Sequence, residues 1–309
     1  MNGNDYAFAV SAVRELENGL LDDNAFLQLS SQNDIETAIT YLAGKGYNGI
    51  EKANDLNNYL QQKLNNTFNE LVHIAPNPKQ LDFLAVENDF HNLKASLKAI
   101  VTDKSCENLF KYPCICNPNT VYDAVKQKQF DELPQFLSDT AQNAYELITS
   151  TLDGQLTDIY IDRCSLECLK NKAYSTQNSF IIDYAETVIA IYNIKSALRI
   201  AHNGGKAENL SDIFAECIKT DIDVLKNKCG KSVNEVTAYV EQTDFKNLAA
   251  AYKKSYAEFE KECTGIIDDL CGRAKFVSFG IEPLIAYYRA VYNEIMKIRL
   301  ILSQKMISV

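Results

Sequence analysis

The sequence predicts an all-α protein, and the prediction rests on composition, hydrophobic periodicity and an internal repeat. The 309 residues include only six prolines and twelve glycines, while good helix formers such as Leu, Ala, Lys, Glu and Gln are plentiful. Tryptophan is absent, but Tyr and Phe make up 10% of the chain and supply bulk for packing between helices. Helices packed against helices are therefore the expected architecture.

The clearest helical periodicity lies in residues 81–101. Apolar side chains recur there at spacings of four, three, four and three residues, at Val86, Phe90, Leu93, Leu97 and Ile100. The preceding segment, residues 55–74, carries an apolar residue at every fourth position. Pro76 and Pro78 lie between the two segments, where proline ends one helix and turns the chain into the next. Together these segments predict a helical hairpin.

Two further hairpins follow the same plan. They comprise residues 156–174 with 181–202, and residues 245–271 with 282–305. Gly204 and Gly205 mark the end of the second hairpin, because glycine favours a helix stop. Pro283 begins the last arm, and proline is tolerated in the first helical turn.

The second arms of the three hairpins can be aligned with one another, as DFHNLKASLKAI, AIYNIKSALRIA and EIMKIRLILSQK. The alignment places Leu93, Ile194 and Ile298 at one position, with spacings of 101 and 104 residues. This period is longer than the 20 to 50 residues of solenoid repeats, so it indicates repetition of a whole helical domain. It predicts three units, residues 1–104, 105–205 and 206–309.

A basic residue follows each aligned position, and a similar one occurs near the N-terminus, in a helix predicted over residues 6–16. These residues are Arg14, Lys94, Lys195 and Arg299. Each belongs to a solvated helix face or to an ion pair inside its own unit that was inherited by duplication, or else it faces an acidic partner protein or joins neighbouring units. The sequence leaves these interpretations open.

Charge and cysteine content narrow the class of protein. The formal net charge of −10 argues against nucleic acid as the main partner, because phosphate binding needs a positive face. No secretion signal and no apolar run of about 18 to 20 residues is recognisable, so a soluble protein without membrane insertion is expected. Nine cysteines, an odd number, suit a reducing cytosol better than a disulfide framework.

A search for catalytic or metal-binding patterns finds only partial matches. Cys114 with Cys116, and Cys164 with Cys168, each supply two thiols, whereas a structural zinc site needs four ligands. The Glu70-Leu-Val-His73 sequence has half of a di-iron ligand pattern, and neither of the other two histidines repeats it. No nucleotide-binding glycine loop or nucleophile elbow is present. We therefore predict no catalytic residue, no cofactor and no metal.

The C-terminal segment resembles a known family. Its features are a Gly and Glu-Pro start, a Tyr-rich stripe and a Lys-Ile-Arg-x-Ile-Leu ending, at Gly280, Glu282, Pro283, Tyr287, Lys297, Ile298, Arg299, Ile301 and Leu302. The segment is similar to the end of the C subunit of bacterial and archaeal V-type (A-type) ATPases, the counterpart of the d subunit of the eukaryotic vacuolar enzyme. Further similarity lies at Asp89, Phe90, His91, Asn92, Leu93 and Lys94, and at Tyr6, Arg14, Leu20 and Leu21.

The resemblance implies a role in a rotary motor. It implies three similar helical domains arranged as a funnel, bound peripherally on the cytoplasmic face of the cell membrane. The implied partners are the central shaft subunits D and F and the rotor ring of proteolipid subunits. In that role the chain would couple shaft and ring without catalysing a reaction. The alternative from composition and periodicity alone is a free-standing helical scaffold or adaptor.

Overall fold

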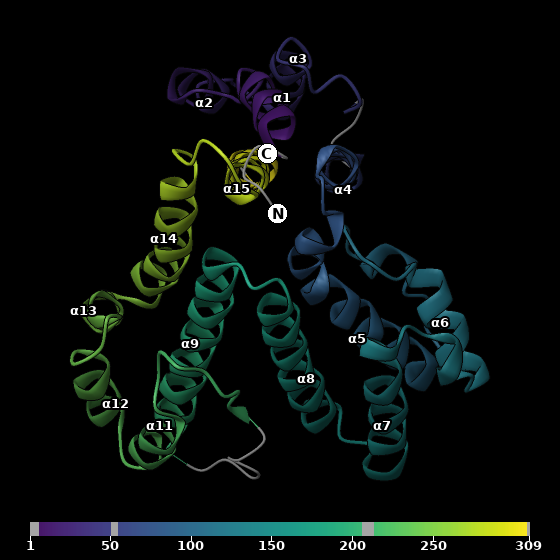
Figure 1. Ribbon diagram of the computed structural model, residues 1–309, viewed down its shortest axis with the longest axis vertical. Helices are drawn as coiled ribbons and strands as arrows, with labels where there is room; N and C mark the ends of the chain where they lie inside the picture. Colours follow the sequence, from purple (N-terminus) through teal and green to yellow (C-terminus); the bar gives the residue numbers. More distant parts are fainter. Residues whose placement is uncertain (1–5, 51–54, 206–212, 308–309) are drawn as a thin grey trace. The chain divides into compact units, whose positions relative to one another are not determined.

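The computed structural model describes residues 6–50, 55–205 and 213–307 (Figure 1). Every regular element within these ranges is an α-helix or a short 3-10 helix, which confirms the all-α prediction. The chain forms two compact units, Met1–Leu81 with Cys271–Val309, and Asp82–Leu270. The division into residues 1–104, 105–205 and 206–309 has different boundaries and stays a prediction.

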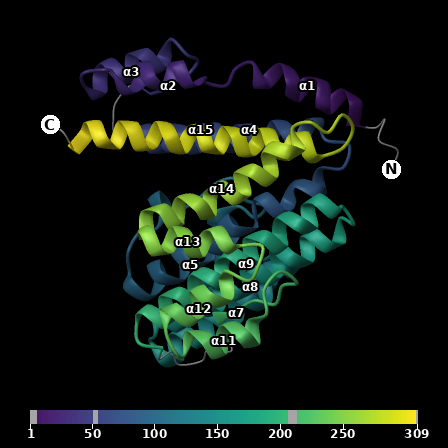
Figure 2. The same ribbon diagram turned by 90° about the vertical axis from the view of Figure 1, so that its left-hand side faces the viewer.

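The first unit contains both ends of the chain. Its helices are α1 (Ala7–Glu17), α2 (Asp23–Ser30), α3 (Ile35–Ala43), α4 (Leu56–Ile74) and α15 (Glu282–Ile307). The long helix α15 contacts each of the other four, and Figure 2 shows it running along α4. Leu284, Ile285, Ile298 and Leu302 of α15 are fully enclosed. The last helix is therefore the centre of this unit's core.

The second unit is a series of packed helices. They are α5 (Val86–Thr102), α6 (Pro118–Gln127), α7 (Gln135–Thr151), α8 (Gly154–Ser175), α9 (Ser179–His202), α11 (Ile222–Cys229), α12 (Val233–Val240), α13 (Lys246–Lys254) and most of α14 (Tyr256–Ala274). Short 3-10 helices lie at Pro78–Leu84, Glu107–Leu109 and Phe130–Glu132. Helix α5 packs against α6 and α8, α8 against α7 and α9, and α9 against α11 and α12.

Polar residues at the helix starts explain where several helices begin. Asp22, Asp34, Asp153, Asn178 and Asp221 each accept a hydrogen bond from a backbone N–H of the first turn. Such side chains satisfy donors that have no partner within the helix. The local sequence therefore fixes these boundaries.

Two predicted helices need correction. Residues 245–271 do not form one helix, because Ser255 is extended, with φ −168° and ψ 160°, and separates α13 from α14. Its hydroxyl accepts from the Glu258 N–H at 3.1 Å, so Ser255 begins a new helix. Residues 81–84 belong to a 3-10 helix that precedes α5. The predicted helices over residues 55–74 and 181–202 agree with α4 and α9.

The hairpin predictions have a mixed outcome. Both arms of the second hairpin, α8 and α9, lie in one unit and pack together. In the other two pairs the arms fall in different units, α4 and α15 in the first, and α5 and most of α14 in the second. None of the helices in the described ranges is both long and apolar enough to cross a membrane.

Candidate functional site

Two buried asparagines hold the segments that follow α5 and α9. The Asn92 side chain donates to the Lys111 carbonyl at 3.0 Å and accepts from the Lys111 N–H at 2.7 Å. Asn193 makes the same pair of hydrogen bonds with Ala215, at 2.7 and 3.1 Å. The two asparagines are 101 residues apart and occupy one position of the aligned segments. This shared contact supports an equivalence between α5 and α9.

Three buried carboxylates lie on the three aligned helices. Asp89 of α5 and Glu186 of α9 are fully enclosed, and Glu294 of α15 is 5% exposed. Each accepts a hydrogen bond from the backbone N–H of a segment remote in sequence, at Cys116, Ile218 and Leu21 respectively. Glu294 also accepts from the Tyr47 hydroxyl, and burial raises the pKa of that tyrosine. These acids connect the long helices to distant parts of their own unit.

Glu186 and Glu294 were not predicted from the sequence, although a signal was present. Glu294 lies three residues after Val291 and four before Ile298, so helical periodicity places its side chain on the buried apolar face of the helix. An acid on an apolar stripe needs a hydrogen-bond donor, because a buried carboxylate without one is costly. The identity of that donor cannot be read from the helix alone, since it lies far away in sequence.

Lys94 and Lys195 form equivalent ion pairs. The Lys94 ammonium binds the Asp162 carboxylate, which joins α5 to α8. Lys195 binds Glu260 at 2.6 Å, which joins α9 to α14. Both lysines therefore reach from an aligned helix to the first arm of the following hairpin. Each lysine thus takes part in an ion pair. The two partners of each pair lie in different predicted units, whereas the ion-pair interpretation places both partners in the same unit.

Arg14 and Arg299 lie in the first unit and have different surroundings. The Arg14 guanidinium binds Glu17 at 3.0 Å and donates to the Lys275 carbonyl. Arg299 contacts the Met296 Sδ at 3.6 Å, and its Nε is buried without a partner among the described residues. The four predicted basic residues therefore have different contacts within their own units, and their role at a partner interface stays a prediction.

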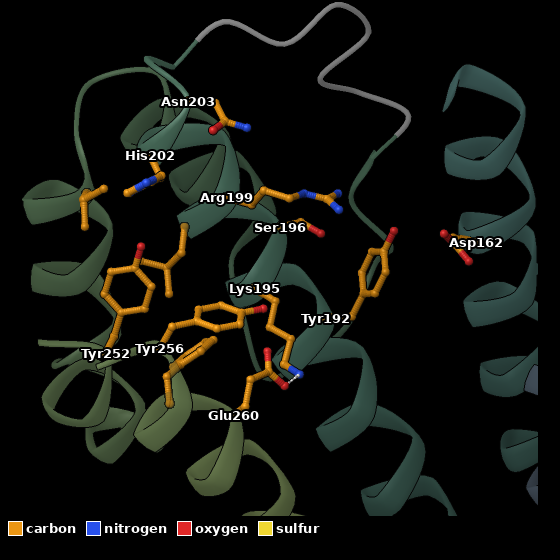
Figure 3. Close-up of a pocket in the computed structure, with 13 residues that line it drawn as sticks. Asp162, Tyr192, Lys195, Ser196, Arg199, His202, Asn203, Tyr252, Tyr256 and Glu260 are labelled. Atoms are coloured by element: carbon orange, nitrogen blue, oxygen red, sulfur yellow. Dashed lines mark hydrogen bonds and ion pairs between the residues drawn. The ribbon is translucent and has the colours of Figure 1, made fainter. Parts of the chain in front are cut away.

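A cavity of about 800 Å³ lies beside Lys195 in the second unit. Figure 3 shows Lys195 and Arg199 on α9, with Tyr252 and Tyr256 on the opposite wall. Further lining residues are Asp162, Tyr192, Ser196, Leu198, His202, Asn203, Val233, Phe259 and Glu260. The cavity thus combines basic groups with aromatic rings.

The cysteines and histidines form no recognisable metal-binding group in the part of the chain that the structure describes. All nine cysteines are free thiols, and no group of three His, Cys, Asp or Glu in the described ranges is placed to hold a metal ion. Burial raises the pKa of Cys114 to about 12 and that of Cys116 to about 11. These thiols are therefore protonated at neutral pH, which makes them poor nucleophiles and poor ligands.

The fold and these contacts define an all-α protein in which ion pairs and buried carboxylates tie the long helices to neighbouring segments. Comparison with known families gives the specific class. The model of the ATP synthase (C/AC39) subunit family matches residues 9–306, so the chain belongs to that family.

A curated relative agrees with this assignment. The C subunit of the V-type sodium ATPase of Enterococcus hirae is 22% identical over 301 residues, which cover 94% of this chain and 90% of the relative. The resemblance seen in the sequence is therefore confirmed, and the chain is a member of the C-type subunits of V-type ATPases.

Proposed function

We propose that this chain links the central shaft of a V-type (A-type) ATPase to its membrane rotor ring. In this proposal it binds shaft subunits D and F on one side and the proteolipid ring on the other. It passes rotation between them during ATP-driven ion transport or ATP synthesis. It lies on the cytoplasmic face of the cell membrane and catalyses neither ATP hydrolysis nor ion movement.

The match of the family model to residues 9–306 is the observation that carries the proposal. Because the match runs through both units, the whole chain and not one segment is expected to serve the function. The packed long helices suit a part that transmits torque, since a helix with a buried face resists bending.

A reconstitution experiment tests the proposal. The purified chain is mixed with the shaft subunits D and F of its own organism and with the detergent-solubilised proteolipid ring. We expect a complex that contains all components, and we expect shaft and ring to stay apart when the chain is omitted. A chain that binds neither component, or only one, would overturn the linking role.

Arg299 gives this experiment a point variant. Arg14 is held by Glu17 and a backbone carbonyl, whereas Arg299 has only a thioether contact among the described residues. An arginine with unused donors suits a carboxylate on a partner. We expect Arg299→Gln to weaken complex formation while the melting temperature of the free chain stays the same. Arg14→Gln is the matched control and should chiefly lower the melting temperature.

A further inference from the structure

Two equivalent helix pairs in the second unit differ in charge. Between α5 and α8, Lys94 binds Asp162, and one turn away Lys98 binds Asp158 at 2.6 Å. Two cations thus face two carboxylates across this pair. The helices also pack directly against one another.

Between α9 and α14 only the first of these ion pairs is kept. Lys195 binds Glu260, as Lys94 binds Asp162. Arg199 lies 101 residues after Lys98, as Lys195 lies 101 residues after Lys94. The matching acid is missing.

The residue at the position of that acid is Tyr256. It precedes Glu260 by four residues, as Asp158 precedes Asp162. The Tyr256 hydroxyl donates to Glu260, and no described carboxylate forms an ion pair with Arg199. The second copy of the interface therefore keeps a cation whose acidic partner has been replaced by a tyrosine.

The space between these helices is also different. The backbones of α9 and α14 make few close approaches, and the cavity of about 800 Å³ lies between them. This volume is in the range of small-molecule sites in proteins, about 300 to 1,000 Å³. Figure 3 shows Arg199 on one wall, with the rings of Tyr192 and Tyr256 lining the same space.

Both acids that line this cavity are paired with a lysine. Glu260 is neutralised by Lys195, and Asp162 by Lys94. Arg199 remains as an exposed cation, and its guanidinium is suited to bind a phosphate or carboxylate through two parallel hydrogen bonds. Tyrosine rings at the cavity wall offer flat faces on which a planar group stacks.

We propose that this cavity binds an organic anion in which a phosphate or carboxylate is joined to a planar ring. Arg199 pairs with the anion, and Tyr192 and Tyr256 lie against the ring. Nucleoside monophosphates and aromatic carboxylates share this chemistry. The site is a property of the chain itself and does not depend on the proposed link between shaft and ring.

Isothermal titration calorimetry on the purified full-length chain tests the proposal. The probes are AMP and benzoate, with adenosine and inorganic phosphate as the separate halves of AMP. We expect saturable one-to-one binding of AMP or of benzoate, and which of the two binds identifies the anion. Adenosine and phosphate should each bind at least about tenfold more weakly than AMP, because each half leaves part of the site unused.

Three variants locate the binding. Arg199→Gln should weaken it about 10- to 100-fold, because a charged hydrogen bond is lost. Tyr256→Asp removes the ring and supplies the missing acid for Arg199, whereas Tyr256→Asn removes the ring alone. The Asp variant should therefore bind AMP or benzoate at least about tenfold more weakly than the Asn variant. Lys98→Gln, the equivalent change at the interface without this cavity, should bind like the unaltered chain.

Three results would each overturn the proposal. It is overturned if neither AMP nor benzoate binds, or if inorganic phosphate binds as tightly as AMP. It is also overturned if binding survives in Arg199→Gln and in Tyr256→Asp. Circular dichroism of each variant confirms that a loss of binding is not a loss of fold.

Discussion

At the scale of single residues, the buried acid Asp89 makes the stability of the fold depend on pH. Its carboxylate accepts from the N–H groups of Ile115 and Cys116, at 3.0 and 2.8 Å. Burial nevertheless raises the pKa of Asp89 to about 6, against an ordinary value of 3.8. The unfolded chain therefore releases this proton first as the pH rises, and the folded state loses stability between about pH 4 and pH 6.

Asp89→Asn should remove this pH dependence. The amide oxygen can still accept from the backbone, and no charge is left to bury. The free energy of unfolding of the variant, relative to the unaltered chain, should rise by up to about 3 kcal/mol from pH 4 to pH 7. Urea unfolding at several pH values measures the difference. Glu87→Gln, an exposed acid on the same helix, controls for the change in net charge, and a gap that does not vary with pH would contradict the assignment.

The paired asparagines give a second prediction at this scale. Asn193→Ala leaves the buried backbone N–H and carbonyl of Ala215 without their side-chain partner. Asn92→Ala does the same to the part-buried N–H and carbonyl of Lys111. Each substitution should therefore lower the free energy of unfolding by about 2 to 4 kcal/mol. Asn143→Ala, which removes one exposed hydrogen bond to Tyr160, should cost less than about 1 kcal/mol. Equal losses at all three positions would argue against this role of Asn92 and Asn193.

At the scale of helices, ion pairs connect elements that already pack through apolar faces. The side chains of Lys94 and Asp162 are 19% and 42% exposed, and those of Lys195 and Glu260 are 35% and 38% exposed. Pairs at such sites contribute little to stability, because water screens the charges. Their main effect is to fix which turn of one helix faces which turn of the next.

A double-mutant cycle measures this effect for each pair. Lys94→Met with Asp162→Asn should give a coupling of about 0.5 to 1 kcal/mol in urea unfolding, and the coupling should fall as salt is added. Lys195→Met with Glu260→Gln should give a similar value. A coupling near zero in both cycles would favour the alternative, in which these lysines serve a partner interface instead.

The helices also show which features a sequence can predict. Helix α9 was predicted closely, because apolar residues recur along it and Gly204 and Gly205 follow its end. The break at Ser255 was missed, although Ser255 and Glu258 have the Ser-x-x-Glu spacing typical of a helix start. The acidic partners of Lys94 and Lys195, which are Asp162 and Glu260, were also missed. Periodicity along one helix does not show which other helix packs against it.

At the scale of the whole molecule, the first unit is assembled from the two ends of the sequence. Helices α1 to α4 precede the second unit in the chain, and α15 follows it. Because α15 contacts all four, the apolar faces of these helices are covered only when the last helix is present. The three-unit division predicted from the repeat cuts the chain differently, since an alignment detects common ancestry and not which elements pack together.

A chain that ends at Ile281 tests this arrangement. It lacks α15, and we expect the first unit to lose its fold, with increased binding of a hydrophobic dye and no assembly with shaft or ring. A chain that ends at Lys305 is the matched control. It keeps Leu302 in the core and keeps the hydrogen bond from Lys305 to the Ser30 carbonyl, so it should behave like the full chain. Normal assembly of the shorter chain would contradict the role given to α15.

The placement of α15 also sets an order of events at the ribosome. Synthesis proceeds from the N-terminus, so α1 to α4 emerge long before the helix that covers them. The second unit ends at Leu270, so all of its residues are synthesised, and it can fold, before α15 of the first unit has been made. A chain abandoned during translation would display uncovered apolar helices to chaperones and proteases. Closure of the first unit therefore has to wait until α15 has been synthesised.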